Sequence, residues 1–400
     1  MALSTSTIDN LVEVMVNRQE RINASIIYRI ARRIKEIGHL LPSDVYKLER
    51  LLKTGSDVKL INQELAKLTA LQVDTIKKLI KDVAVGAYLD TKPFYDYRQL
   101  PFIPFEQNTN LQRVVKAIER QTSETYVNLS KAQAYMIRDL KNPKRLVPTP
   151  LSQTYQTIID EAVQASQSGI IDYNTAMRRS MQQLIDSGLR TVEYQAESGR
   201  LHTQEMGAAV RRNVLDGIRA INQGVQDVTG EQFGADGKEI TVHSYPAPDH
   251  CNCQGHQFTN AEWDKIQSGE DFKDIQGRRY IGFPRKIGTL NCRHFAYSII
   301  IGHASQNYTD EQLQNILDAN EKGYTMPNGK HLTMYECTQK QREYERRIRK
   351  AKTGQKAALE AGDDALAAKY NAQIDRLNKE YISFSKACGL KPKMQKTTIS

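Results

Sequence analysis

Residues that could do chemistry are concentrated between His243 and His294. This stretch holds all but two of the five cysteines and half of the eight histidines. Thiols and imidazoles are the donors that zinc prefers, usually four of them arranged as two close pairs. The sequence therefore predicts a tentative zinc site with a structural role, and its four best candidate ligands are His243, His250, Cys292 and His294.

Two other interpretations of this stretch stay open. Cys292 can be a small buried residue, with the histidines hydrogen-bonded inside a tight loop. Alternatively, Cys292 with a histidine is a possible nucleophile, or an acid such as Asp249 or Asp264 completes a metal-dependent nuclease acting on DNA. The sequence has no nucleophile elbow and no phosphate-binding Gly-rich loop, so we expect no enzyme.

The segments around this cluster must position it, and most of them are helical. We expect a mainly α protein with a small α+β module at about 233–305 and a C-terminal helical hairpin. The predicted order is a helical bundle at 1–90, an extended aromatic and proline-rich connector at 91–108, a helical domain at 109–232, a module at 233–334 that carries the cluster, and a basic hairpin tail at 335–400.

Three patterns support this division. Isoleucines at 22, 26, 30, 34 and 37 form one face of a first helix. Residues 239–242 and 295–301 favour strands. Near the C-terminus, Gly362 interrupts a helical pattern, after which apolar residues recur every three or four positions from Leu366 to Phe384. The connector has two interpretations, a linker packed on a neighbouring domain or an arm that docks on a partner.

The charge is positive and uneven. The net charge is +10, and residues 336–400 contain fifteen Lys and Arg against eight Asp and Glu. Such a surplus suggests a polyanionic neighbour, so sequence-independent DNA binding is a second alternative function. The candidate phosphate contacts lie on one predicted helix: Arg342, Arg346, Arg347, Arg349, Lys350 and Lys352. A solvated helix face is the simpler explanation of the same pattern.

The cellular setting is predicted from composition. Five cysteines form no disulfide framework, which fits a reducing cytoplasm. The first residues lack a basic start followed by an apolar run, so no signal peptide is expected. The apolar run 297–301 is far too short to span a bilayer, and no membrane association is predicted.

The order of motifs resembles a known family. The residues His243, His250, Gln254, Gly255, Phe258, Asn291, Cys292, Arg293 and His294, followed by Gly302, are similar to those of phage minor capsid proteins of the minor capsid protein 2 type. These are related to head morphogenesis proteins typified by the F protein of phage Mu. Flanking segments at 198–215, 335–342 and 384–390 agree. The likeness is strongest over residues 190–395, and only helical character matches before that.

The resemblance implies a low-copy virion component of a tailed phage. It implies assembly in the host cytoplasm, association with the portal vertex, and three kinds of partner: the portal protein, a major capsid or scaffolding protein, and viral DNA. Its motif assigns Gln254, Gly255, Asn291 and Arg293 to the conserved loop pattern of that family. This chain departs from the family at Ala247, where an arginine is usual, and at Cys251 and Cys253.

Overall fold

The computed structural model describes most of the chain. The described residues are 5–37, 56–139, 142, 144–151, 153–154, 157–158, 173–194, 201–282, 285–288, 292 and 294–398. They divide into two compact units, each assembled from separated segments. Unit 1 comprises Met1–Val12, Val73–Thr125 and Arg211–Gln339, and unit 2 comprises Glu13–Gln72, Tyr126–Val210 and Lys340–Ser400.

Long helices dominate both units, as predicted from the sequence. Five of them contribute residues to both units: α1 (Thr5–Ile37), α3 (Ser56–Leu89), α5 (Thr109–Lys131), α8 (Met206–Phe233) and α11 (Met334–Ala361). Of the isoleucines expected on one face of the first helix, Ile26 and Ile30 are buried and Ile22 is half-buried, while the side chains of Ile34 and Ile37 lie outside the described part of the chain. The mainly α fold class with a small α+β module is thus confirmed.

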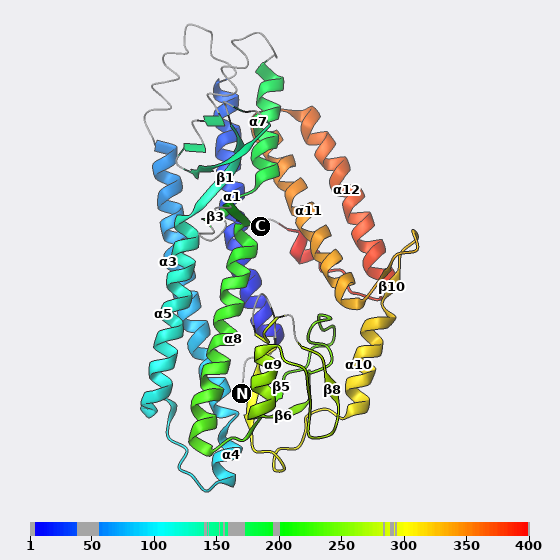
Figure 1. Ribbon diagram of the computed structural model, residues 1–400. Helices are drawn as coiled ribbons and strands as arrows, with labels where there is room; N and C mark the ends of the chain where they lie inside the picture. Colours follow the sequence, from blue (N-terminus) through cyan, green and yellow to red (C-terminus); the bar gives the residue numbers. More distant parts are fainter. Residues whose placement is uncertain are drawn as a thin grey trace. The chain divides into compact units, whose positions relative to one another are not determined.

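Unit 1 contains the small α+β module. Its sheet has the order β6-β5-β9 and is antiparallel throughout, with β5 (Gly237–Ile240) paired to both β6 (Gln257–Thr259) and β9 (Ala296–Ile299). Figure 1 shows α9 (Asn260–Ser268) beside this sheet. A capping box fixes the start of α9, since the Thr259 hydroxyl accepts from the backbone of Glu262 and the Glu262 side chain accepts from Thr259.

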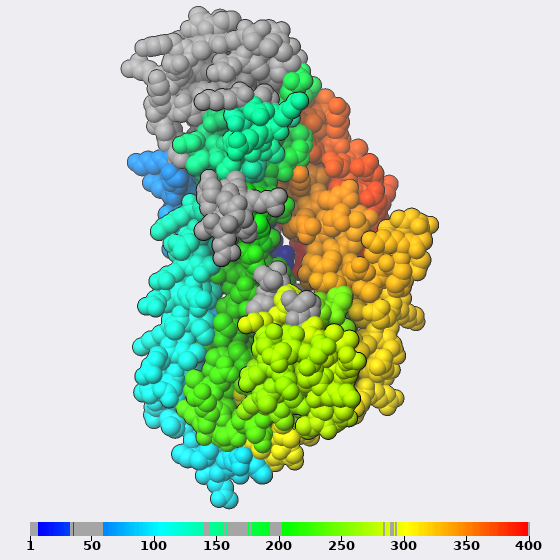
Figure 2. Space-filling view, in the orientation of Figure 1, coloured from blue at the N-terminus to red at the C-terminus, as the bar shows by residue number. Residues whose placement is uncertain are grey.

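Short hairpins and one further helix complete the module. These are β7 (Phe272–Lys273), β8 (Arg279–Tyr280), α10 (Asp310–Lys322), β10 (Tyr324–Thr325) and β11 (His331–Leu332). In the space-filling view the residues of about 233–300 form one continuous mass, coloured green to yellow (Figure 2). Its core is aromatic and aliphatic and includes two of the cluster's three thiols: Ile240, Cys253, Phe258, Ile266, Phe272, Tyr280, Ile287 and Cys292.

The connector at 91–108 is not extended throughout, which corrects the prediction. It contains α4 (Lys92–Tyr97) and a 3-10 turn (Phe105–Gln107). Pro93 occupies the first turn of α4, where its missing N–H costs no hydrogen bond. Aromatic rings of the segment pack within unit 1, with Phe94 stacked on Phe233 at 5.0 Å and Phe102 stacked on Tyr88 at 4.4 Å between centroids. This finding favours the packed interpretation of the connector.

Unit 2 contains a sheet that the sequence did not predict. Residues 109–232 were expected to be helical, yet four strands occur there in the order β2-β1-β3-β4, all antiparallel. The strands are β1 (Gln133–Arg138), β2 (Leu146–Pro150), β3 (Arg190–Tyr194) and β4 (Leu201–Glu205). Between them, α7 (Tyr173–Ser187) ends at Gly188, which adopts a positive φ of 60° as a helix-ending glycine can.

The C-terminal hairpin is formed as predicted, and all of it from Lys340 onward belongs to unit 2. Helix α11 turns at Gly362, where φ is +75°, into α12 (Asp364–Ala387), and Figure 1 shows the two helices side by side. The Asp363 side chain caps α12 by accepting from Leu366 N–H. The apolar face of α12 is buried, including Tyr370, Leu377 and Tyr381.

Candidate functional site

Three buried side chains of the 243–294 cluster converge in unit 1. One potential ligand atom from each of His250, Cys292 and His294 lies within 4.8 Å of the other two. Cys292 Sγ is 3.2 Å from His250 Nδ1 and 3.4 Å from His294 Nδ1. The thiol thus lies between two imidazoles, and each imidazole presents the same ring nitrogen to it.

These three residues come from two separate connections between strands of the module. His250 lies in a turn between β5 and β6, whereas Cys292 and His294 directly precede β9. Because β9 pairs with β5, the two connections meet at one end of the sheet. Gly255 closes the first connection: its N–H donates to Ile240 C=O at 2.8 Å, and its φ of +74° suits glycine.

In each imidazole, the ring nitrogen Nε2, which does not face Cys292, lies next to an oxygen atom. His250 Nε2 is 2.7 Å from the backbone oxygen of Arg285, whose guanidinium is in turn paired with Asp249 at 2.6 Å. His294 Nε2 is 3.3 Å from Gln254 Oε1. The same Gln254 oxygen accepts the backbone N–H of His243 at 2.9 Å, and this donor fixes which end of the amide faces His294.

Burial and neighbouring groups shift the pKa values of His250, Cys292 and His294. Burial raises the pKa of Cys292, but the hydrogen bond from His250 and the backbone groups of Gly288 and His294 outweigh it, and the net pKa is lowered. Burial lowers the pKa of His294 to about 2, helped by His243, His250 and Arg285. Burial also opposes the charged form of His250, yet its hydrogen bonds to Cys292 and Arg285 give a raised pKa.

This arrangement can supply either a polarised thiol or a set of soft metal donors. A thiolate beside an imidazolium is the pair that cysteine nucleophiles use. Here, however, His250 is fully buried and Cys292 is only 5% exposed, so a substrate has little access to the sulfur. The geometry favours a site that holds an ion or a loop over one that attacks a substrate.

The other predicted residues of this stretch lie around the three. His243 is outside the group of converging ligand atoms, although its ring contacts that of His294 with centroids 4.6 Å apart. The thiol of Cys253 is buried and donates to His250 C=O, while that of Cys251 donates to Pro248 C=O. Asn291 and Arg293 lie outside the described residues.

Arg285 is a functional neighbour that sequence reasoning missed. Its backbone oxygen orients His250, and it lies 35 residues further along the chain. Backbone carbonyls carry no sequence signal, so only the fold could reveal this contact. Asp249 was considered as an acid for a nuclease, but in the structure it pairs with Arg285.

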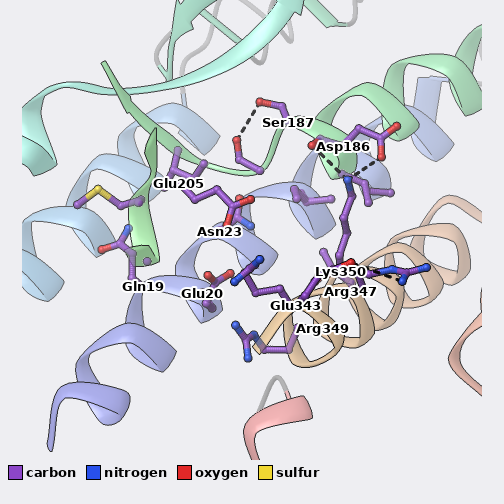
Figure 3. Close-up of a pocket in the computed structure, with 18 residues that line it drawn as sticks. Gln19, Glu20, Asn23, Asp186, Ser187, Glu205, Glu343, Arg347, Arg349 and Lys350 are labelled. Carbon is purple, nitrogen blue, oxygen red and sulfur yellow. Dashed lines mark hydrogen bonds and ion pairs between the residues drawn. The ribbon is translucent and has the colours of Figure 1, made fainter. Parts of the chain in front are cut away.

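The basic residues predicted to bind DNA lie on α11 in unit 2, and several of them line a cleft of about 290 Å³. Figure 3 shows Arg347, Arg349 and Lys350 on one wall, opposite Gln19 and Glu20 of α1. Lys350 pairs with Asp186 at 2.8 Å, and Arg349 donates to the backbone oxygen of Lys396.

The exposure of these basic residues differs along the helix. Arg346 and Arg347 are exposed, and Arg347 lies 3.8 Å from Glu343. Arg342 is only partly exposed. Partial burial lowers the pKa of Lys352. Lys350 is exposed as well, but it is paired with Asp186.

No helix in the described part of the chain is both long enough and apolar enough to cross a membrane.

Comparison with known proteins gave one result. The model of the family described as phage minor capsid protein 2 matches residues 3–384. No curated protein and no solved structure was found to match the chain. Because the match spans nearly the whole sequence, it also covers residues 3–189, where the motifs quoted above gave no support. The chain therefore belongs to the phage minor capsid protein 2 family.

Proposed function

We propose that this chain is a low-copy virion protein of a tailed phage, incorporated at the portal vertex during head assembly. The match to the minor capsid family over residues 3–384 carries the capsid part of this proposal. The portal protein and a major capsid or scaffolding protein are the proposed partners, because a low-copy component needs a vertex that differs from the rest of the shell.

The test is quantitative mass spectrometry of purified virions and of DNA-free proheads. We expect a few copies of this chain per portal ring in both particles. Presence in proheads shows that incorporation precedes DNA packaging. Absence from both particles, with the protein abundant only in the infected cytoplasm, would overturn the proposal.

We further propose that the basic face of α11 contacts the packaged DNA through phosphates. The exposed Arg346 and Arg347 support this, since both lie on the cleft wall. Arg347 lies 3.8 Å from Glu343 and 5.9 Å from the centre of the Tyr344 ring, so its guanidinium stays at the surface. Lys350 and Arg349 are engaged by Asp186 and by the Lys396 carbonyl. Phosphate contacts of this kind give affinity without sequence preference and weaken as salt releases the counterions.

Salt-dependent DNA binding of the full-length protein tests this role. Replacing Arg346 and Arg347 together by Ala should weaken binding and reduce the slope of log K against log salt by about 2, close to one per lost contact. The matched control replaces Lys369 and Lys379, two exposed lysines of α12, and removes the same charge elsewhere in unit 2. Equal losses in both double variants would show a general charge effect and contradict an α11 contact.

A further inference from the structure

We propose that His250 Nδ1, Cys292 Sγ and His294 Nδ1 together bind a zinc ion, with the Arg285 backbone oxygen and Gln254 orienting the two imidazoles. All three side chains lie in unit 1, and zinc binding there does not depend on where the protein lies in a virion. The ion would join two connections of the module that are 42 residues apart in sequence.

The hydrogen bonds on the far side of each ring determine where its proton lies. A carbonyl or amide oxygen can only accept, so the nitrogen facing it must carry hydrogen. Arg285 O faces His250 Nε2, and Gln254 Oε1 faces His294 Nε2. Neutral imidazoles so arranged both present the lone pair of Nδ1 to Cys292.

One thiol cannot satisfy two such lone pairs. A cysteine S–H has a single proton, so it can donate to only one of the two nitrogens at a time. With that proton moved onto His250, the His294 lone pair faces a thiolate. A cation at the centre satisfies both nitrogens and the sulfur at once.

The spacing of the three atoms fits that centre. Zinc bonds of about 2.3 Å to sulfur and about 2.0–2.1 Å to nitrogen, at tetrahedral angles, place sulfur and nitrogen about 3.5 Å apart. The two observed sulfur–nitrogen distances are 3.2 and 3.4 Å, and the three ligand atoms all lie within 4.8 Å of one another. Both sulfur–nitrogen distances are thus close to those of a zinc site.

The donor types select the ion. A thiolate with two imidazoles suits zinc and excludes calcium and magnesium, which prefer oxygen ligands. Oxygen acceptors on the distal nitrogens are the usual outer contacts of zinc-bound histidines. His294 also lines a cleft of about 200 Å³ in unit 1. The three donors leave one tetrahedral position for a further ligand.

Cobalt substitution in the reduced full-length protein tests the site. After removal of metals with a chelator, Co²⁺ should bind with one-to-one stoichiometry and give a thiolate-to-cobalt charge-transfer band that Zn²⁺ abolishes. Cys292→Ser should lose this band. Cys251→Ser is the matched control, because Cys251 lies in the same loop cluster but outside the converging donors, and it should keep the band.

A second variant keeps the test decisive if Cys292→Ser fails to fold. Gln254→Ala removes the contact that orients His294 and the acceptor of the His243 N–H, but no proposed zinc ligand. It should weaken zinc binding roughly 10–100-fold while far-ultraviolet circular dichroism stays unchanged. Native mass spectrometry of the wild-type protein should show one bound zinc. A folded wild-type protein that takes up neither ion, or a charge-transfer band that persists in Cys292→Ser, would overturn the proposal.

Discussion

At the scale of single residues, Gly255 shows how tightly the loop around the cluster is packed. A Cβ built on this glycine would lie 2.4 Å from Leu313 Cδ2 and 2.8 Å from Val242 Cγ2. Its positive φ adds backbone strain for any other residue. The neighbouring Gln254 orients His294, so a displacement at Gly255 reaches the cluster directly.

We expect Gly255→Ala to lower the free energy of unfolding by about 3–5 kcal/mol, because it combines left-handed strain with overpacking. Gly277→Ala is the matched control. Gly277 also has a positive φ, of 81°, but open space surrounds its missing Cβ, so only the strain of about 1–2 kcal/mol remains. Denaturant titrations of both variants measure the difference, and equal losses would contradict the packing argument.

Only part of the site could be predicted from the sequence, namely the part that residue types and spacings reveal. Cys292 and His294 were recognisable from residue type and spacing, and His250 from its place in the same cluster. The proton positions were not, because they depend on Arg285 O and on the orientation of the Gln254 amide. Those contacts are products of the fold and leave no pattern in the sequence.

At the scale of elements, one buried carboxylate organises the β7–β8 hairpin. Asp274 Oδ1 accepts the backbone N–H groups of Gln276 and Arg278, while its Oδ2 accepts from Arg278 Nε at 2.6 Å. Tyr280 also donates to Oδ2. Two strands of two residues each have few ladder bonds of their own, so this side chain substitutes for them.

Asp274→Asn should cost about 1–3 kcal/mol near neutral pH, since the amide loses the charge-assisted bond to Arg278. Burial raises the pKa of Asp274, but the hydrogen bonds and charge of Arg278 outweigh it and hold the pKa below the usual 3.8. The stabilisation is therefore complete above pH 3.8 and is lost as the pH falls through the lower folded value. Thermal unfolding from pH 7 to pH 2.5 should show the two proteins converging only at the acidic end.

The elements also differ in how far the sequence predicted them. The hairpin of α11 and α12 was predictable because its apolar period persists for many turns and Gly362 marks the break. The strands β1 to β4 were missed. They have five or six residues each, and β1 pairs with β3 across more than 50 positions, so no local alternation identifies them.

At the scale of the whole molecule, unit 2 depends on residues that are remote in sequence. Tyr370 of α12 donates to Gln182 of α7 at 2.6 Å, and Tyr135 of β1 donates to Asn23 of α1 at 2.7 Å. Lys396 pairs with Glu13, 383 positions earlier. The unit's core therefore needs all three of its segments.

Removing residues 340–400 should therefore unfold residues 126–210 while sparing residues 211–339. The truncated chain loses the partners of Gln182 and Glu13 and exposes the apolar surface that α12 buries. Hydrogen exchange measured by mass spectrometry reports each segment separately. Retained protection across 126–210 would show that this segment is stable alone. The variant Tyr370→Phe, which removes one hydrogen bond and no segment, serves as the mild control.

Because unit 2 is built from three separated segments, the ribosome synthesises the parts of one folded unit at different times. Residues 13–72 are synthesised early, and those of their partners that lie in residues 340–398, such as Lys396 for Glu13, emerge last. Until then, the 126–210 segment is the other part of the unit that can cover their apolar surface. A chain interrupted by a premature stop before residue 340 thus leaves part of this surface open, which marks it for chaperones and proteases.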